Sequence, residues 1–330
     1  MTQPIIASLT QPMFDQFIAP VDDELVSRLV RVDPSLGYAA LVEALNASHA
    51  PILMTAWQSV PLPESFLADC PDIKVVCHLT GGMRPLIPRA LIERGLLVTN
   101  WGDAITDTVA EAALLLILSC LRRSVQCQMN LHIRKGWREG ITEPDSLLGR
   151  KVGLHGLGSV ARHLTRFLAP FACQVSAYSP PVPDELFHQY HVRREASLDR
   201  LFAENDVIVE LAALTPQTVG MVDERLLRLI RPGGVLVNVG RGPVIDGAAL
   251  ARVALEGKIW IGLDVTDPEP LPPDSPLRGL ENVFLTPHMA GPTVDRRYRC
   301  GIHAFKNIRA FMRGEPLDAV IGLTQYDRMT

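Results

Sequence analysis

A large net charge is missing from this 330-residue sequence, in which 32 lysine and arginine residues face 36 aspartate and glutamate residues. The formal net charge of -4 excludes a sequence-wide basic footprint for nucleic acid. The six cysteines include no C-x-x-C pair, and no cysteine–histidine cluster has the spacing of zinc ligands. A disulfide framework and a metal site are therefore not expected, and we interpret the cysteines as reduced core thiols.

Long apolar runs are missing as well. The most apolar stretch, residues 112–121, would form about 15 Å of helix, half of what a bilayer requires. Residues 1–8 have neither the basic nor the long apolar segment of a secretory signal. The prolines and glycines follow no repeat, which excludes collagen-like and low-complexity chains. We expect a cytoplasmic protein with no membrane partner and no nucleic-acid partner.

The sequence does contain an alternation of short apolar runs and helical patterns, which is typical of a parallel sheet covered on both faces. The expected strands lie near residues 5–9, 52–55, 73–77, 96–100, 151–155, 174–178, 206–211, 234–238, 259–264 and 283–286. The expected helices lie near residues 25–30, 39–45, 107–123, 159–171 and 297–314. The chain is also longer than one hydrophobic core usually serves, which favours two domains.

The predicted fold class is α/β, with one domain inserted into the other. Residues 101–290 are expected to form a Rossmann domain, a doubly wound parallel sheet that binds a dinucleotide. Residues 1–100 and 291–330 are expected to form a flavodoxin-like α/β substrate domain.

A glycine-rich loop follows directly on one of the expected strands and opens a helix. The run Gly156-Leu-Gly158-Ser-Val-Ala161 has the dinucleotide pattern G-x-G-x-x-G/A in this strand–turn–helix context. Gly156 permits the tight turn, Gly158 allows close approach of the pyrophosphate, and Ala161 allows close helix packing. The N–H groups of Ser159 and Val160 would then face the pyrophosphate at the positive end of the helix. The loop predicts a nicotinamide dinucleotide as cofactor.

The second strand of the unit ends without the acidic residue that NAD sites usually place there. Ser179 stands at that position, where an acid would bind the ribose 2′-OH. A serine removes repulsion toward a 2′-phosphate, yet Pro180 and Pro181 follow instead of a basic residue. Arg193 and Arg194 are partners for such a phosphate only if the chain folds back. The sequence therefore leaves both NAD and NADP open.

Three ionisable residues follow three later strands. Arg241, Glu269 and His288 each come just after an expected strand, and the carboxyl ends of parallel strands form the ligand crevice. A guanidinium binds a carboxylate and a carbonyl oxygen in bidentate fashion. His288 can exchange a proton near neutral pH, and Glu269 beside it would favour the imidazolium and orient the ring. This chemistry suits hydride transfer to a 2-oxo acid.

At these residues the chain resembles the NAD(P)-dependent D-2-hydroxyacid dehydrogenase family, which includes glyoxylate/hydroxypyruvate reductases and phosphoglycerate dehydrogenase-like enzymes. The resemblance covers nearly the whole chain and is strongest over 95–295. The matching runs are Glu93–Asn100, Thr108–Glu111, Gly156–Gly158, Leu214–Thr218, Asn238–Gly242, Gly262–Val265 and Thr286–Gly291.

The resemblance implies the site in more detail. It implies Arg241 as substrate clamp, Glu269 as partner of the histidine and His288 as acid and base. It implies a homodimer formed through residues 107–123 and nearby segments that include Trp137. The further cofactor contacts that it implies are Thr108, Val239, Gly240, Gly291 and, at the nicotinamide carboxamide, Asp264.

The family holds the substrate carboxylate on a glycine-rich loop of the smaller domain. That loop falls here at residues 79–84, where Gly81 and Gly82 can present backbone N–H groups as an anion nest. The family usually has an Asp-Asn pair just after the loop, whereas this chain has Arg84-Pro85. Arg84 is either a second anion contact, which would favour a phosphorylated or dicarboxylate substrate, or a surface arginine at a helix start.

Two other functions stay open at this point: a dinucleotide-sensing corepressor without catalysis, and a phosphite-type dehydrogenase. Both would use the same fold and cofactor. Formate dehydrogenases usually carry glutamine at the position of Glu269, which argues against that activity. The leading hypothesis is an NAD(P)-dependent 2-hydroxyacid dehydrogenase, in which His155 has no assigned role.

Overall fold

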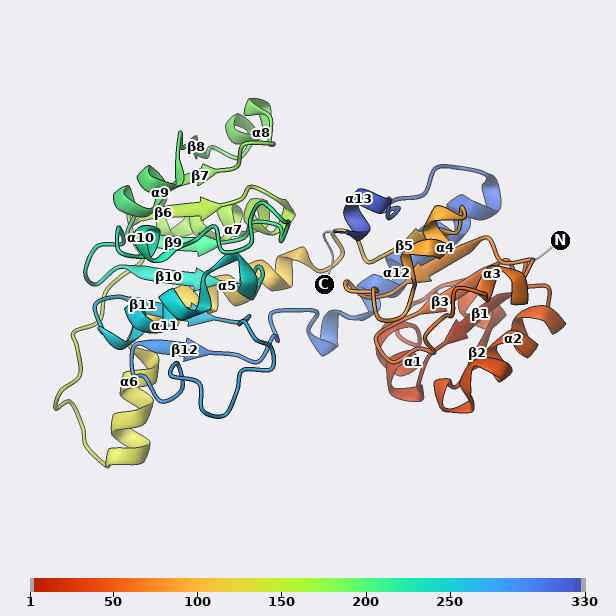
Figure 1. Cartoon of the computed structure of the whole chain (residues 1–330), viewed down its shortest axis with the longest axis horizontal. Coiled ribbons are helices and arrows are strands. Elements are labelled where there is room, and N and C mark those ends of the chain that lie inside the picture. The colour runs from red at the N-terminus through yellow and green to blue at the C-terminus, as the bar shows by residue number, and fades with distance from the viewer. Residues whose placement is uncertain (1–2, 328–330) are drawn as a thin grey trace. The chain divides into compact units, whose positions relative to one another are not determined.

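The computed structural model describes residues 3–327 and contains two compact units (Figure 1). The first runs to Ile105 and takes up the chain again from Pro292, and the second is Thr106–Gly291. Within residues 3–327, no helix is both long and apolar enough to cross a bilayer. All six cysteines are unpaired, and four of them are buried: Cys70, Cys77, Cys120 and Cys300.

The first unit is a five-stranded, fully parallel sheet with helices packed against it. Its strand order is β2 (Leu29–Val32), β1 (Ile5–Ser8), β3 (Ile52–Thr55), β4 (Val75–His78) and β5 (Leu97–Thr99). This is the 2-1-3-4-5 order of flavodoxin-like sheets. Its helices are α1 (Gln11–Phe17), α2 (Gly37–Ala47), α3 (Phe66–Asp69), α4 (Arg89–Glu93), α12 (Tyr298–Arg313) and α13 (Leu323–Tyr326).

The helix expected at residues 25–30 is wrong. A 3-10 helix, Glu24–Arg28, is followed there by the edge strand β2, which pairs with β1 only. The β-branched residues Val30 and Val32 favour the strand, and pairing with β1 supplies the backbone hydrogen bonds that a short isolated helix would lack.

The second unit is a seven-stranded parallel sheet. The strands lie in the order β12 (Val283–Leu285), β11 (Trp260–Leu263), β10 (Val235–Asn238), β9 (Val207–Glu210), β6 (Lys151–His155), β7 (Gln174–Tyr178) and β8 (Arg193–Arg194). The helices are α5 (Thr106–Leu121), α6 (Ser124–Gln128), α7 (Ser159–Leu168), α8 (Asp184–Gln189), α9 (Leu198–Glu204), α10 (Glu224–Leu227) and α11 (Gly247–Leu255). The predicted α/β class with a Rossmann domain is confirmed.

The chain order of the second sheet reverses between β6 and β9. From β6 the chain continues to β7 and β8 on one side, and from β9 to β10, β11 and β12 on the other. Ligands of open α/β sheets bind outside the carboxyl ends of the strands at such a reversal. The reversal therefore locates the candidate site of this unit.

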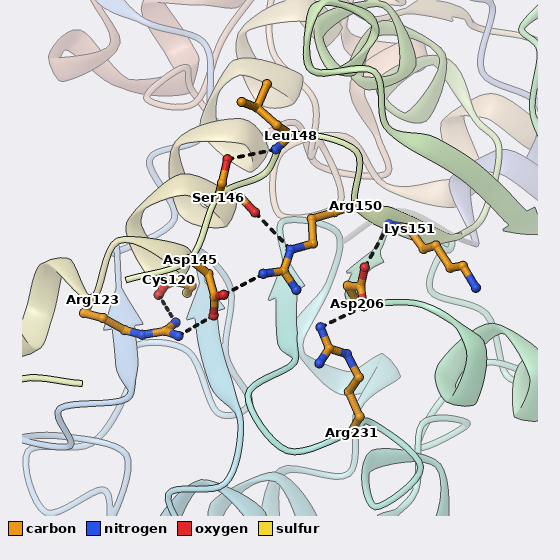
Figure 2. Close-up of polar contacts among 9 residues, drawn as sticks. All are labelled: Cys120, Arg123, Asp145, Ser146, Leu148, Arg150, Lys151, Asp206 and Arg231. Atoms are coloured by element: carbon orange, nitrogen blue, oxygen red, sulfur yellow. Dashed lines mark hydrogen bonds and ion pairs between the residues drawn. The ribbon is translucent and has the colours of Figure 1, made fainter. Parts of the chain in front are cut away.

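Polar contacts secure the opposite, amino end of β6 (Figure 2). The carboxylate of Asp206 accepts a hydrogen bond of 3.0 Å from the backbone N–H of Lys151 and lies 2.8 Å from Arg231. Nearby, Asp145 accepts from the buried Arg123 at 2.7 Å and from Arg150 at 2.6 Å. These ion pairs tie loops to the start of the strand, away from the site.

Candidate active site

The glycine-rich loop has the space that a bound phosphate needs. Gly156 has φ +99°, and a Cβ there would lie 2.9 Å from the carbonyl oxygen of Leu211. The chain therefore requires glycine at this turn. A Cβ on Gly158 would meet nothing within 4 Å, so open space lies in front of that residue. Ala161 is fully buried against the sheet, as close packing of α7 requires.

The amino end of α7 is free to bind an anion. Gly158 is its N-cap residue, and no side chain of the described residues caps this end. The N–H groups of Ser159 and Val160 begin the first turn, where the helix dipole favours negative charge. Uncapped donors beside the open space at Gly158 fit the pyrophosphate of a dinucleotide.

The chain does fold back beside the end of β7. The short strand β8, which sequence reasoning missed, pairs with β7 and aligns Arg194 with Ala177. The Arg194 guanidinium donates to the carbonyl oxygen of Ser179 at 3.4 Å and lies 2.5 Å from Asp184. It also stacks over the ring of Phe187 at 3.9 Å. An arginine therefore lies next to the serine that replaces the usual acid.

Arg241 is held by its own loop after β10. Its Nη1 donates to the carbonyl oxygen of Gly240 at 2.7 Å. The Asn238 side chain fixes the loop, because it accepts from Gly240 N at 3.0 Å and donates to Arg241 O at 3.1 Å. Burial lowers the pKa of Arg241 from its ordinary value, and the nearby Glu269 carboxylate opposes this effect. The guanidinium stays charged and oriented.

Glu269 and His288 come together, as their positions after successive strands predict. Nδ1 of His288 lies 2.9 Å from Oε1 of Glu269, and both side chains are about half exposed. His288 has φ +51°, a left-handed conformation that is uncommon outside glycine and is found at functional sites. A hydrogen bond of 2.8 Å from His288 N to Asp264 O holds this conformation.

Asp264 serves the loop of His288. Its Oδ1 accepts from Thr286 Oγ1 at 2.6 Å and from Met289 N at 2.8 Å, and its Oδ2 accepts from Ala290 N at 3.0 Å. A buried carboxylate with three such donors fixes the loop at both sides of His288. Sequence reasoning missed this positioning role, which follows only from the folded contacts.

A cavity of about 610 Å³ lies beside the His288–Glu269 pair. Glu269, His288, Asp264 and Thr286 line it, and so does Arg278. Arg278, which the sequence did not single out, donates to the carbonyl oxygens of Leu271 and Pro272 at 2.7 and 2.8 Å, and so holds the loop that follows Glu269.

The other predicted cofactor residues belong to the same unit. Thr108 is buried in the first turn of α5, Val239 is buried between Asn238 and Gly240, and Gly291 ends the unit.

In the first unit, a buried histidine supports the loop of Gly81 and Gly82. His78 ends β4, and its Nε2 lies 3.1 Å from Gly82 O and 2.6 Å from Thr80 Oγ1. Its Nδ1 lies 2.9 Å from Thr55 Oγ1. A carbonyl only accepts, so Nε2 carries the proton and donates to Gly82 O. Burial lowers the pKa of His78 to about 4, which keeps the ring neutral.

The loop of residues 79–84 is packed at Gly81 and exposed at Arg84. A Cβ on Gly81 would lie 2.4 Å from the indole of Trp101, so the tryptophan packs directly on the glycine. Arg84 is exposed, and its guanidinium lies 5.9 Å from the ring centre of Tyr326. The packing of Gly81 and the support of Gly82 were not predictable from the glycine pattern alone.

Comparison with known proteins gives one family. The sequence profile described as "D-isomer specific 2-hydroxyacid dehydrogenase, NAD binding domain" matches residues 114–290. The glyoxylate/hydroxypyruvate reductase A of Arabidopsis thaliana is 31% identical over 302 residues, which are 90% of this chain and 94% of that protein. The hydroxyphenylpyruvate reductase of Plectranthus scutellarioides is 32% identical over 250 residues, 75% of this chain and 78% of that protein.

A solved structure is similar over the same length. The NADPH-dependent glyoxylate/hydroxypyruvate reductase from Sinorhizobium meliloti, in complex with citrate, superposes with a TM-score of 0.76 at 25% identity. The match covers 98% of this chain and 99% of that chain.

Proposed function

This chain belongs to the D-isomer specific 2-hydroxyacid dehydrogenase family, and from that premise we propose that it interconverts a 2-oxo acid and a 2-hydroxy acid with a nicotinamide dinucleotide. The observation that carries the proposal is the contact of 2.9 Å between His288 and Glu269 at a cavity beside the Arg241 loop. A dinucleotide-sensing corepressor and a phosphite-type dehydrogenase find no support among the relatives named above.

His288 exchanges the proton of the reaction. Because Nδ1 is engaged with Glu269, Nε2 is left to donate a proton to the carbonyl oxygen during reduction and to accept it during oxidation. The Glu269 carboxylate stabilises the imidazolium and holds the ring in orientation. When bound, the dinucleotide supplies the hydride that adds to C2 of the 2-oxo acid.

Two groups hold the substrate in this proposal. The Arg241 guanidinium donates to the carboxylate and carbonyl oxygens, so that the carbonyl is polarised where negative charge develops. In the first unit, the N–H groups of Gly81 and Gly82, on the loop that His78 supports, form an anion nest that suits a carboxylate. Arg84 ends this loop, and its exposed guanidinium beside Tyr326 is the proposed further anion contact.

The cofactor preferred is NADPH. Ser179 lacks the charge that would repel a 2′-phosphate, and Arg194 lies against the same loop. The relatives support a nicotinamide dinucleotide in general, and one of them is named as NADPH-dependent. The proposed contacts of the dinucleotide are Thr108, Gly156, Gly158, Ser159, Val160, Ser179, Val239, Gly240, Asp264 and Gly291.

The proposed assembly is a homodimer in the cytoplasm. In the second unit, the π-helix Met129–Arg134 and the segment after it expose apolar side chains: Leu131 is 38%, Ile133 74% and Trp137 69% exposed. Such a patch is typical of an interface. Six unpaired cysteines fit a reducing compartment. Sedimentation of the full chain and of Trp137→Ser tests the dimer.

Steady-state oxidation of NADPH and NADH tests the proposed reaction. Glyoxylate, hydroxypyruvate, pyruvate and 4-hydroxyphenylpyruvate cover the substrates named for the relatives and one small homologue. Turnover of at least one 2-oxo acid is expected. If the dinucleotide binds and none of the four acids is reduced, the proposed reaction is wrong and a binding function replaces it.

A further inference from the structure

Two ionisable residues end the strands on either side of the reversal in the second sheet. His155 ends β6, Glu210 ends β9, and the two are register partners on adjacent parallel strands. His155 is 3% exposed and Glu210 is fully buried. Neither residue has a part in the proton transfer or substrate binding proposed above. His155 directly precedes the phosphate loop, and Glu210 directly precedes the loop of residues 211–213.

The contacts of this pair join the two loops. Nδ1 of His155 lies 2.5 Å from Oε2 of Glu210. The other carboxylate oxygen, Oε1, accepts a hydrogen bond of 2.8 Å from the N–H of Ala212. In addition, Leu211 N donates to His155 O at 2.9 Å. The Glu210 carboxylate therefore links the end of β6 to the backbone that follows β9.

The backbone held in this way touches the phosphate loop. Leu211 O and Ala212 N lie 2.9 and 3.1 Å from where a Cβ on Gly156 would be. On the other side, a Cβ on Gly240, next to Arg241, would lie 3.6 Å from Ala212 O. Residues 211–212 therefore pack between the phosphate loop at Gly156 and the Arg241 loop at Gly240. A shift of this segment would displace the backbone of Gly156.

A buried contact between two ionisable side chains contributes little to the free energy of unfolding. Removing two charges from water costs free energy that their attraction only partly returns, and apolar pairs of similar size are often as stable. The hydrogen bonds of His155 and Glu210 instead restrict the backbone of the phosphate loop and of residues 211–213. Binding is stronger where the site is already in its bound form, because less entropy is lost on association.

We propose that His155 and Glu210 are positioning residues of the dinucleotide site. Their hydrogen bonds hold residues 211–212 against Gly156 and so keep the phosphate loop in its binding form before the dinucleotide arrives. This inference rests on the proposed function, since it assumes that the loop of Gly156 and Gly158 binds a dinucleotide.

The test compares variants of the full chain by calorimetric titration with NADPH and NADH. In His155→Leu/Glu210→Leu both polar side chains and both of their hydrogen bonds are removed, and we expect Kd to rise about tenfold or more. In Glu210→Gln the amide oxygen accepts from Ala212 and the amide nitrogen donates to His155, so Kd should stay within about threefold of wild type. Hydrogen exchange without dinucleotide should be faster at residues 211–213 in the double variant only.

Asp206→Asn is the matched control. Asp206 lies 2.8 Å from Arg231 at the amino end of β6, opposite His155, so this change weakens an ion pair at the same strand away from the loop (Figure 2). It is expected to lower the thermal midpoint and to leave Kd unchanged.

Several outcomes would overturn the inference. It is wrong if the double variant folds and binds both dinucleotides within about twofold of wild type, or if Asp206→Asn weakens binding equally. If the double variant does not fold, His155→Phe/Glu210→Gln removes only the contact between the imidazole and residue 210, and an unchanged Kd in that variant overturns the inference. If neither variant folds, the pair is structural and the inference is also wrong. Wild-type protein that binds neither dinucleotide would instead remove the proposed function.

Discussion

Nδ1 of His288 lies 2.9 Å from Oε1 of Glu269, across two loops that follow successive strands of one sheet. Through this contact the carboxylate fixes the orientation of the imidazole ring.

Loss of His288 should remove the proton transfer and spare the binding. For His288→Ala we expect kcat to fall about 100- to 10,000-fold, the range of positioned acid–base catalysis, with the Kd of NADPH unchanged. Glu269→Gln should lower kcat less, because the ring is still present. Undiminished turnover by His288→Ala would exclude His288 from the reaction.

A point charge should not replace the guanidinium of Arg241. Lysine cannot donate in bidentate fashion, so Arg241→Lys is expected to lower kcat/KM for the 2-oxo acid about 10- to 100-fold. Arg252→Lys is the control, since Arg252 is an exposed arginine of α11 paired with Glu224 at 2.7 Å. Equal steady-state constants for the two variants would contradict the assignment of Arg241.

The two glycines of the phosphate loop should respond differently to an added methyl group. Gly156→Ala places a Cβ 2.9 Å from Leu211 O at φ +99°, and we expect a loss of about 1–3 kcal/mol in the free energy of unfolding. Gly158→Ala has open space and should change stability by less than about 1 kcal/mol. Its methyl group would occupy the space of the pyrophosphate, so calorimetry should show weaker dinucleotide binding; unchanged Kd would contradict the placement.

Cofactor preference should depend on Arg194. In Arg194→Ala the Kd of NADPH is expected to rise about tenfold, through loss of a charge-assisted bond to the 2′-phosphate, while that of NADH changes little. The control is Arg225→Ala, which removes an exposed arginine paired with Asp199. Parallel weakening of both dinucleotides by Arg194→Ala would show that Arg194 supports the loop and does not choose the cofactor.

His78 should make stability depend on pH. Its pKa is about 4 in the folded chain and 6.5 ordinarily, so the unfolded chain binds a proton first as pH falls. Stability is complete above pH 6.5 and should fall by about 3 kcal/mol between pH 7 and pH 4 from this group. Urea unfolding of wild type and His78→Gln at both pH values measures the difference. Equal losses in the two proteins would show that His78 does not titrate in this way.

Local sequence patterns predicted the parts of the molecule that are built locally. The order of the strands along the chain was enough to predict the turn at Gly156 and Gly158. It was also enough to place Arg241, Glu269 and His288 after successive strands. The edge strand β2 was mistaken for a helix, because a four-residue run is stabilised by pairing with β1 and carries little pattern of its own. The short strand β8 was missed for the same reason.

Contacts that depend on register could not be predicted. His155 and Glu210 are 55 positions apart in sequence and meet because β6 and β9 are aligned neighbours. Their only signal was the rare placement of an ionisable residue at the end of a buried strand. His78 carried the same signal before the other glycine loop.

Gly242, next to Arg241, leaves no room at its Cα. A Cβ there would lie 2.0 Å from Thr266 O, so the segment that bears Arg241 and the segment that leads to Glu269 are in backbone contact. A larger residue at Gly242 therefore cannot be used to change the distance between Arg241 and Glu269. Divergence of substrate range within this architecture has to arise elsewhere, in loops whose side chains can vary without moving the groups that carry out the reaction.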